Sequence, residues 1–228
     1  MRKPVVDYRK LRLSNITDPK YSHLLLLLGW LGYFAMYFLT ENLIPVENCH
    51  VIHSRLDDLI PFCEFFVIPY VFWYLLIVIS LGYFALYNID SFRKLQTYII
   101  ITQVVAMSIY IIFPNMQDLR PAEFERDNFF TFIVSLLYRF DTNTNVCPSL
   151  HVAYSLGIAS VWTKEKGVGI AWKSFVVVAV ILICLSTMFI KQHSAVDFFV
   201  ALPVCLLAEV LVYHKFYKDK AVERKRLK

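Results

Sequence analysis

The sequence predicts an all-α integral membrane bundle of six transmembrane helices, with both termini in the cytoplasm. Composition is the first reason, because 58% of the 228 residues are hydrophobic and only 18% are charged, whereas soluble domains are about 25% charged. A second reason is that apolar runs recur at the roughly 20-residue length that crosses a bilayer. The third is that basic residues concentrate in alternate segments between these runs. An ordinary soluble domain is therefore excluded.

The six expected spans cover 22–40, 64–87, 95–113, 148–163, 171–190 and 194–217. The fourth span is short and rich in small residues, among them Ala153 and Gly157, which suits a helix packed inside a bundle. The first span follows a charged segment and precedes no small-residue cleavage site, so we expect it to be retained. The predicted organisation is one membrane domain over 22–217, flanked by basic cytoplasmic tails at 1–21 and 218–228.

Basic residues give these spans an orientation. Eighteen of the 23 Lys and Arg residues fall in the two tails, the loop between spans two and three, and the loop between spans four and five. Basic loops face the cytoplasm, so the remaining loops are predicted to lie outside. The net charge of +5 then reflects topology and contact with anionic lipid rather than nucleic-acid binding. Compact size without targeting extensions predicts a bacterial plasma membrane.

Two histidine motifs are predicted to meet on the outer face. His151 ends a Pro-Ser-Leu-His motif at the start of the fourth span, and His193 precedes Asp197 by four residues at the start of the sixth. Both spans run from outside to inside, so both motifs begin at the same face. Residues four apart lie on one side of a helix, which lets Asp197 hold one ring nitrogen of His193. Polar groups at the mouth of an apolar segment are functional candidates, so these three are the candidate catalytic residues.

Groups near the histidines predict phosphate binding. Arg120, in the outer loop 113–147, and Lys191 are two of only five basic residues outside, and both would neutralise phosphate oxygens. Ser149 and Leu150 begin the fourth span, and a helix N-terminus offers free N–H groups and a positive dipole end to a phosphate. We therefore predict these four as phosphate-binding residues.

The same constellation predicts phosphoryl transfer without a metal or other cofactor. His193, oriented by Asp197, would attack phosphorus and form a phosphohistidine. His151 would protonate the leaving alkoxide and then activate water as a base. Stabilisation of charge on the transferring group would supply most of the rate.

With these motifs, the chain resembles the type-2 phosphatidic acid phosphatase superfamily, which includes vanadium haloperoxidases and several lipid phosphotransferases. In one large branch the second motif is Pro-Ser-Leu-His, as at 148–151, and the third motif ends in His-x-x-x-Asp, as at His193 and Asp197. The resemblance covers most of 22–217. It implies a six-helix membrane architecture, His193 as the nucleophile and His151 as the acid and base.

Two positions depart from the family's pattern. Phe113 stands where the first motif has a lysine, seven residues before the arginine of Arg-Pro, and Thr187 stands where the third motif usually has an arginine. Lys191 is expected to replace the lost cation, as in relatives with Pro-Ser-Leu-His. The phosphate-binding arginine is then one of three outer residues, with Arg120 favoured over its competitors Arg126 and Arg139.

Three functions fit these residues. The favoured one is a phosphatase that hydrolyses phosphatidate-like or polyprenyl (di)phosphate lipids at the outer leaflet. A second is a headgroup phosphotransferase similar to inositol-phosphorylceramide synthases, in which a lipid or polyol hydroxyl replaces water. The third is a nonenzymatic lipid-binding or transport protein that retains a dead site. The expected partner in each case is a membrane lipid, and the oligomeric state stays open.

Spacing alone does not make a catalytic site. His53 and Asp57 repeat the His-x-x-x-Asp spacing in the first outer loop, where we expect a stretch without fixed helical register. His50, His53, Asp57 and Asp58 resemble a metal cluster, but we predict no metal site there. One disulfide is compatible with the three outer cysteines, Cys49, Cys63 and Cys147.

Overall fold

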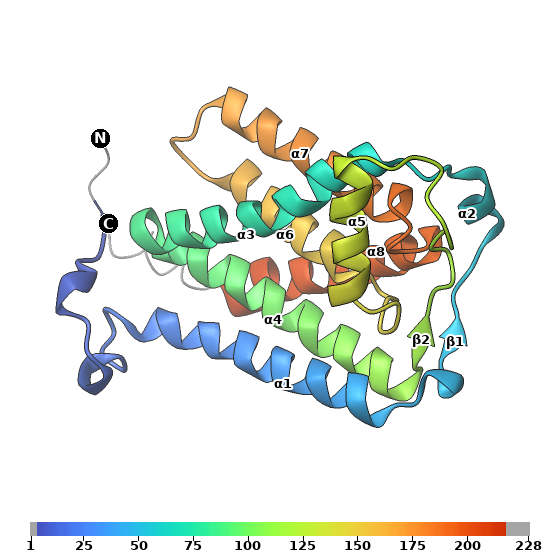
Figure 1. Ribbon diagram of the computed structural model, residues 1–228. Helices are drawn as coiled ribbons and strands as arrows, with labels where there is room; N and C mark the ends of the chain where they lie inside the picture. The colour runs from blue at the N-terminus through green and yellow to red at the C-terminus, as the bar shows by residue number, and fades with distance from the viewer. Residues whose placement is uncertain (1–3, 218–228) are drawn as a thin grey trace.

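The computed structural model describes residues 4–217 and is mostly helical (Figure 1). Its long helices are α1 (Leu28–Leu43), α3 (Val67–Tyr87), α4 (Ile89–Ile112), α6 (Leu150–Lys164), α7 (Ile170–Phe189) and α8 (Ala195–Val210). Short 3-10 helices precede α1 and α3 (Ser22–Leu27 and Glu64–Phe66), and a π-helical turn follows α8 (Leu211–Phe216). The predicted tail at 218–228 and the first three residues lie outside the described part of the chain.

Smaller elements fill the loops at one end of the bundle. They are α2 (Arg55–Leu59), α5 (Phe129–Phe140) and the two-residue strands β1 (His50–Val51) and β2 (Asn115–Met116). The strands pair in parallel, with His50 opposite Asn115, and so join the segment between α1 and α3 to the segment between α4 and α6. Further 3-10 turns span Tyr8–Lys10, Leu13–Asn15 and Val46–Asn48.

Five described helices are long and apolar enough to cross a membrane: Ser22–Leu43, Glu64–Tyr87, Ile89–Ile112, Ile170–Phe189 and Ala195–Phe216. They correspond to five of the six expected spans. The remaining one, α6, has only 15 residues and is shorter than the roughly 20 that a bilayer requires. The structure thus confirms the prediction of an all-α membrane bundle, with five helices of membrane-spanning length among the described residues.

Helix α6 occupies the centre of the bundle, as its small residues predict. It packs against α3, α4, α7 and α8, and nine of its 15 residues are buried. Gly157 is required for this packing, since a Cβ atom there would lie 2.5 Å from the Tyr98 ring of α4. A short helix enclosed by its neighbours can thus carry polar groups that lipid would not tolerate.

The third span begins earlier than the predicted residue 95. Asn88 caps α4 by accepting a hydrogen bond from Ser91 N, and the helix starts at Ile89. Arg93 and Lys94, predicted in a loop, are therefore helical. The Asn88 cap and the acidic residue Asp90 in the first turn both favour a helix start at this point. The helix therefore begins several residues before the continuous apolar run.

The chain segments between helices gather at two opposite ends of the bundle (Figure 1). At one end, Val5 N donates to Leu86 O (2.7 Å), Ser91 Oγ to Glu165 Oε2 (2.6 Å), and Thr97 lies 2.9 Å from the Tyr217 hydroxyl. The N-terminal segment, the α3–α4 turn, the α6–α7 loop and the end of the described chain therefore share that end. These are the described parts of the segments predicted to be cytoplasmic.

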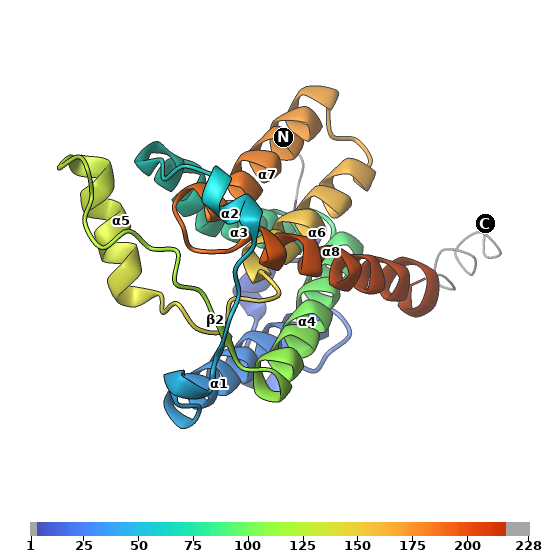
Figure 2. The same ribbon diagram turned by 90° about the vertical axis from the view of Figure 1, so that its right-hand side faces the viewer.

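The opposite end holds the loops that precede α3, α6 and α8. Figure 2 looks onto this end and shows α2 beside the start of α8, with α5 at the edge. The expectation of a plain loop over 113–147 is wrong at α5, where Asn128 accepts from Phe130 N and Thr131 N. This amphipathic helix buries Thr131 and Val134 and exposes Phe129 and Phe132, which is typical of a helix at a membrane interface.

Candidate functional site

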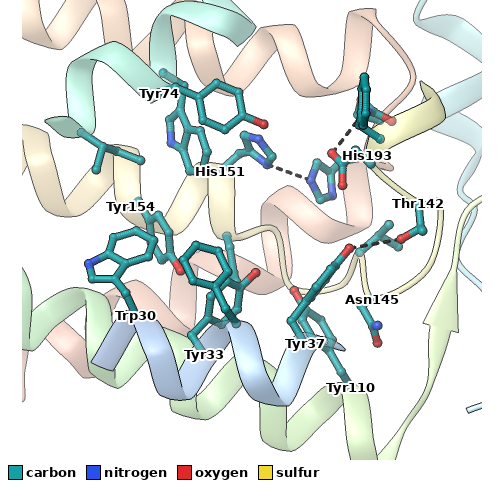
Figure 3. Close-up of a pocket in the computed structure, with 18 of the residues that line it drawn as sticks. Trp30, Tyr33, Tyr37, Tyr74, Tyr110, Thr142, Asn145, His151, Tyr154 and His193 are labelled. Carbon is teal, nitrogen blue, oxygen red and sulfur yellow. Dashed lines mark hydrogen bonds between the residues drawn. The ribbon is translucent and has the colours of Figure 1, made fainter. Parts of the chain in front are cut away.

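The two predicted histidine motifs lie together at this end of the bundle. His193 Nδ1 is 3.1 Å from Asp197 Oδ2, and His193 Nε2 is 3.4 Å from His151 Nδ1 (Figure 3). The Asp197 side chain is fully buried and only 9% of the His193 side chain is exposed. A buried carboxylate accepts a hydrogen bond from Nδ1–H. It therefore favours the tautomer of His193 in which Nδ1 carries the proton and Nε2 carries the free lone pair. The predicted meeting of the motifs is confirmed.

Helix starts place both histidines. Ser149 caps α6 by accepting from Val152 N, and Ser194 caps α8 in a capping box with Asp197. Asp197 Oδ2 accepts from Ser194 N at 2.9 Å in addition to His193. Ser149 N donates to Asp197 O at 3.2 Å, which joins the two helix starts directly. The relative position of His151 and His193 is therefore set by backbone contacts.

A tight reversal between α7 and α8 orients His193. The amides of Gln192 and His193 both donate to Thr187 O, at 2.9 and 3.0 Å. Lys191 adopts the left-handed conformation that this reversal needs, with φ of 54°, which is uncommon for a residue other than glycine. Thr187 thus holds the histidine segment through its carbonyl group.

Aromatic rings fix His151. Its imidazole packs against the rings of Trp73, at 4.1 Å between ring centroids, and Tyr70, at 4.5 Å. Both residues belong to α3, so this helix forms the wall behind the acid–base candidate. His151 Nε2 is buried and has no hydrogen-bond partner among the described residues. A buried ring nitrogen without a partner is costly.

Asp57 was not predicted to belong to the site. It is 3% exposed and accepts from Ala195 N (2.7 Å) and Ser194 Oγ (2.6 Å), as well as from both donors of Ser54. Burial disfavours its charge, but these hydrogen bonds outweigh burial and hold the pKa of Asp57 below its ordinary value. Asp57 therefore caps the start of α8 from α2, next to the catalytic candidates.

The expectation of an irregular stretch around His53 is wrong, because residues 55–59 form α2. The His53–Asp57 spacing nevertheless makes no pair. His53 Nε2 lies 2.8 Å from Asp58 Oδ1, while His50 stacks on Phe113 at 4.3 Å between centroids. Residues 4–217 contain no group of three or more His, Cys, Asp or Glu placed to hold a metal ion.

Arg120 contacts Gln192, the residue before His193, and forms no hydrogen bond with either histidine. Its guanidinium donates to the carbonyl oxygens of Tyr138, Asp141 and Thr142, and to Gln192 Oε1 at 2.6 Å. A planar cation suits the carbonyls at the C-terminal end of α5. Burial lowers the pKa of Arg120 from its ordinary value, and nearby Asp141 opposes that shift. Its predicted contact with phosphate stays a prediction.

The other predicted cations also contact protein groups. Lys191 Nζ donates to Asp57 O and Ile60 O and so joins the histidine segment to α2. Arg126 donates to Glu64 Oε1 at 3.3 Å, and Arg139 is exposed on α5. Of the three candidate arginines, Arg120 has the direct link to the histidine segment, through Gln192. Phosphate binding by Lys191 likewise stays a prediction.

A cavity of about 530 Å³ opens in front of His151 and His193. Its walls combine aromatic and aliphatic side chains of α1 and α3 with polar residues of the segment between α5 and α6. Leu150 lines it and Ser149 is completely buried beneath. The N–H groups of Leu150 and His151 belong to the first turn of α6, which has no helical acceptors for them. A tetrahedral anion beside His193 would have these donors within the same site.

Asp141 is a second residue that the sequence did not single out. It lines the cavity, and its Oδ2 accepts from the Tyr70 hydroxyl (3.0 Å) and Gln192 Nε2 (3.2 Å). Burial raises the pKa of Asp141, and the charges of His193 and Arg120 oppose that increase. Asp141 follows α5 in the long segment between α4 and α6. Local sequence patterns do not predict the path of such a segment.

All five cysteines are free thiols, so the allowed disulfide is not formed. Cys147 is buried beside the site, and burial followed by the charge of Asp197 raises its pKa to about 12. A thiol with so high a pKa is a poor nucleophile at neutral pH. This leaves His193 as the nucleophile candidate.

Comparisons with known proteins found no relative of this chain. No family model matches the chain, no curated protein matches it, and no solved structure matches it. The geometry of the site is therefore the basis for a functional interpretation.

Proposed function

We propose that this protein is a membrane lipid phosphate phosphatase that works through a phosphohistidine on His193, as its resemblance to the type-2 phosphatidic acid phosphatase superfamily implies. One observation carries the proposal: a His193–Asp197 pair and a second histidine, His151, face a shared cavity in a bundle of membrane-length helices. A nucleophile, its orienting carboxylate and an acid–base group are the parts that covalent catalysis needs.

The reaction proceeds in two balanced steps. His193 Nε2 attacks phosphorus, the bond from phosphorus to the lipid oxygen breaks, and His151 donates a proton to the leaving alkoxide. Water then gives a proton to His151 and attacks phosphorus, which breaks the phosphorus–nitrogen bond. The products are a lipid alcohol and phosphate, and both histidines return to their initial state. Asp197 favours the positive charge that develops on His193.

The shape of the cavity supports a lipid substrate. Beyond the histidines its lining continues along α3 with Ile77, Val78 and Leu81 and along α1 with Phe34. Phe34 and Val78 are more than half exposed, and in a bilayer that surface would meet lipid chains. A headgroup could therefore sit at the histidines while its chains remain in the membrane.

A headgroup phosphotransferase is the second candidate, and a feature of the cavity favours it. Within residues 4–217, no lysine or arginine lines the cavity. A phosphodiester carries a single negative charge and so needs less compensation than a dianionic monoester. An acceptor hydroxyl would then replace water in the second step.

A lipid panel distinguishes these functions. Purified protein in detergent should release inorganic phosphate from at least one lipid phosphate, without added metal and in the presence of a chelator. Headgroup exchange that appears only when diacylglycerol or ceramide is added would assign the transferase instead. If neither product forms with any lipid, the protein is a nonenzymatic lipid-binding or transport protein.

We also propose that the site faces the extracytoplasmic side of a six-span protein. The end opposite the site carries the described residues of the basic segments, and basic segments face the cytoplasm. In a cysteine-free background, Glu47→Cys in the exposed turn Val46–Asn48, at the end of the bundle that holds the site, should react with an impermeant reagent added to intact cells. Lys166→Cys should react only after permeabilisation. The reverse pattern would overturn this orientation.

A further inference from the structure

The charge inside the cavity is unusual for a site that handles phosphate. Asp141 is the only Asp or Glu that lines it, and the lining contains no lysine or arginine within residues 4–217. Arg120, one layer behind, donates to the Asp141 backbone carbonyl, and no hydrogen bond joins it to the carboxylate. A phosphate that enters therefore meets a carboxylate, and two anions in a low-dielectric cavity repel each other.

The carboxylate of Asp141 has an unused acceptor. Oδ2 receives the hydrogen bonds from Tyr70 and Gln192, while Oδ1 accepts none from the described residues. These contacts hold the side chain so that it lines the cavity. Burial raises the pKa of Asp141 because it disfavours the charged carboxylate. A cation beside Oδ1 would stabilise that charge.

Aromatic rings surround the same space. Trp30, Tyr33 and Tyr37 line it from α1, and Trp73 and Tyr74 line it from α3. Figure 3 shows the α1 tyrosines across the cavity from His151 and His193. Tyr and Trp rings attract alkylammonium groups through their π faces, and a desolvated site strengthens this attraction. Rings with one adjacent carboxylate are a recognition site for such a cation.

We propose that the cavity selects lipid phosphates that carry an alkylammonium group near the phosphate, with Asp141 as the counter-charge and the α1 and α3 aromatic rings as the walls. The ammonium group also reduces the net charge of the substrate and so removes the repulsion between phosphate and Asp141. This inference rests on the proposed function, because it specifies the substrate for the same two-step reaction. The ammonium can belong to a sphingoid base or to an ethanolamine or choline headgroup. With a headgroup lipid, the lipid alcohol leaves in the first step and water releases the headgroup phosphate in the second.

Two matched lipid pairs test the proposal and separate these sources. Sphinganine 1-phosphate is compared with its N-acyl derivative, and phosphatidylethanolamine with phosphatidylglycerol of the same chains. The measured quantity is kcat/KM for cleavage at phosphorus. We expect the ammonium member of at least one pair to be favoured about tenfold or more. Equal kcat/KM values within both pairs would overturn the proposal.

Asp141→Asn shows whether Asp141 causes the preference. The substitution keeps an acceptor for Tyr70 and removes the charge, so the ratio within the favoured pair should fall toward one. Asp118→Asn removes the same charge from an exposed outer residue and should leave the ratio unchanged. If Asp141→Asn lowers both members of a pair equally, Asp141 acts on His193 rather than on the headgroup and the proposal is wrong. Should Asp141→Asn fail to fold, Tyr33→Leu is expected to reduce the ratio by removing one wall.

A binding measurement separates this proposal from the catalytic one. His193→Ala protein in maltoside is titrated with hexylphosphocholine and with hexyl phosphate, and the fluorescence of Trp30 and Trp73 reports occupancy. Preferential binding of hexylphosphocholine, lost in the His193→Ala, Asp141→Asn double variant, supports the headgroup site even if the wild type cleaves no lipid. Equal binding of both probes would contradict the headgroup site whether or not the wild type is a phosphatase.

Discussion

Replacing His193 with alanine is expected to reduce release of phosphate from the best lipid substrate by at least about 10³-fold. In the proposed mechanism the substitution removes the atom that attacks phosphorus. The neighbouring Cys147 thiol is a poor substitute, because burial followed by the charge of Asp197 raises its pKa. The fold should persist, because the His193 side chain lines a cavity and its backbone amide, bonded to Thr187 O, is unaffected. Initial rates under chelator measure the effect.

His53→Ala is the matched control. His53 has the same spacing to an aspartate, but it pairs with Asp58 on the exposed surface of the first outer loop. Its removal should leave the rate within about twofold of wild type, because a surface pair contributes little. A His193→Ala protein that retains more than about a tenth of the wild-type rate would show that another group is the nucleophile.

Replacing Asp57 with alanine is expected to lower both stability and rate. The change leaves Ala195 N and Ser194 Oγ buried without an acceptor, which costs about 3 kcal/mol of unfolding free energy. The start of α8 would also shift, and small displacements of a reacting group reduce rates roughly 10- to 100-fold. We expect kcat to fall with little change in KM, because Asp57 does not line the cavity.

Asp58→Ala is the control, since the side chain of this neighbour is 64% exposed and hydrogen-bonds to the surface residue His53. Acid supplies a second test. The pKa of Asp57 is lowered by folding, so its stabilising contribution is complete above the ordinary carboxyl pKa of 3.8 and is lost as the pH falls through the lowered value. Asp57→Ala should therefore lose less stability on acidification than wild type does. An identical acid dependence of the two proteins would contradict this assignment.

The catalytic candidates were predictable because they depend on local geometry. Asp197 lies four residues after His193, and a helix start places both on one side. The alternation of basic and acidic loops placed the two helix starts at one end of the bundle. Neither inference requires knowledge of how the helices pack. The small residues of α6 predicted its central position for a similar reason, since they permit close approach of neighbouring helices.

The supporting residues depend on long-range packing and were not predictable. Asp57 is 138 residues from Ala195, and Asp141 is 51 from Gln192. Each lies in an outer loop whose course the apolar pattern does not describe. The amphipathic period of α5 was a usable signal for its C-terminal end, where Asp141 sits. The contacts of Arg120 with carbonyl groups had no such signal, because a loop arginine has the same sequence appearance whether it binds phosphate or protein.

Covalent labelling of His193 tests the central claim most directly. The lipid that the panel identifies as the best substrate is prepared with ³²P in its phosphate, mixed with the protein and quenched within one turnover. The proposed mechanism predicts a label on the His193 peptide that acid removes and alkali preserves, and that is absent from His193→Ala. Turnover of the lipid without this label, or with the label on a different residue, would contradict the mechanism.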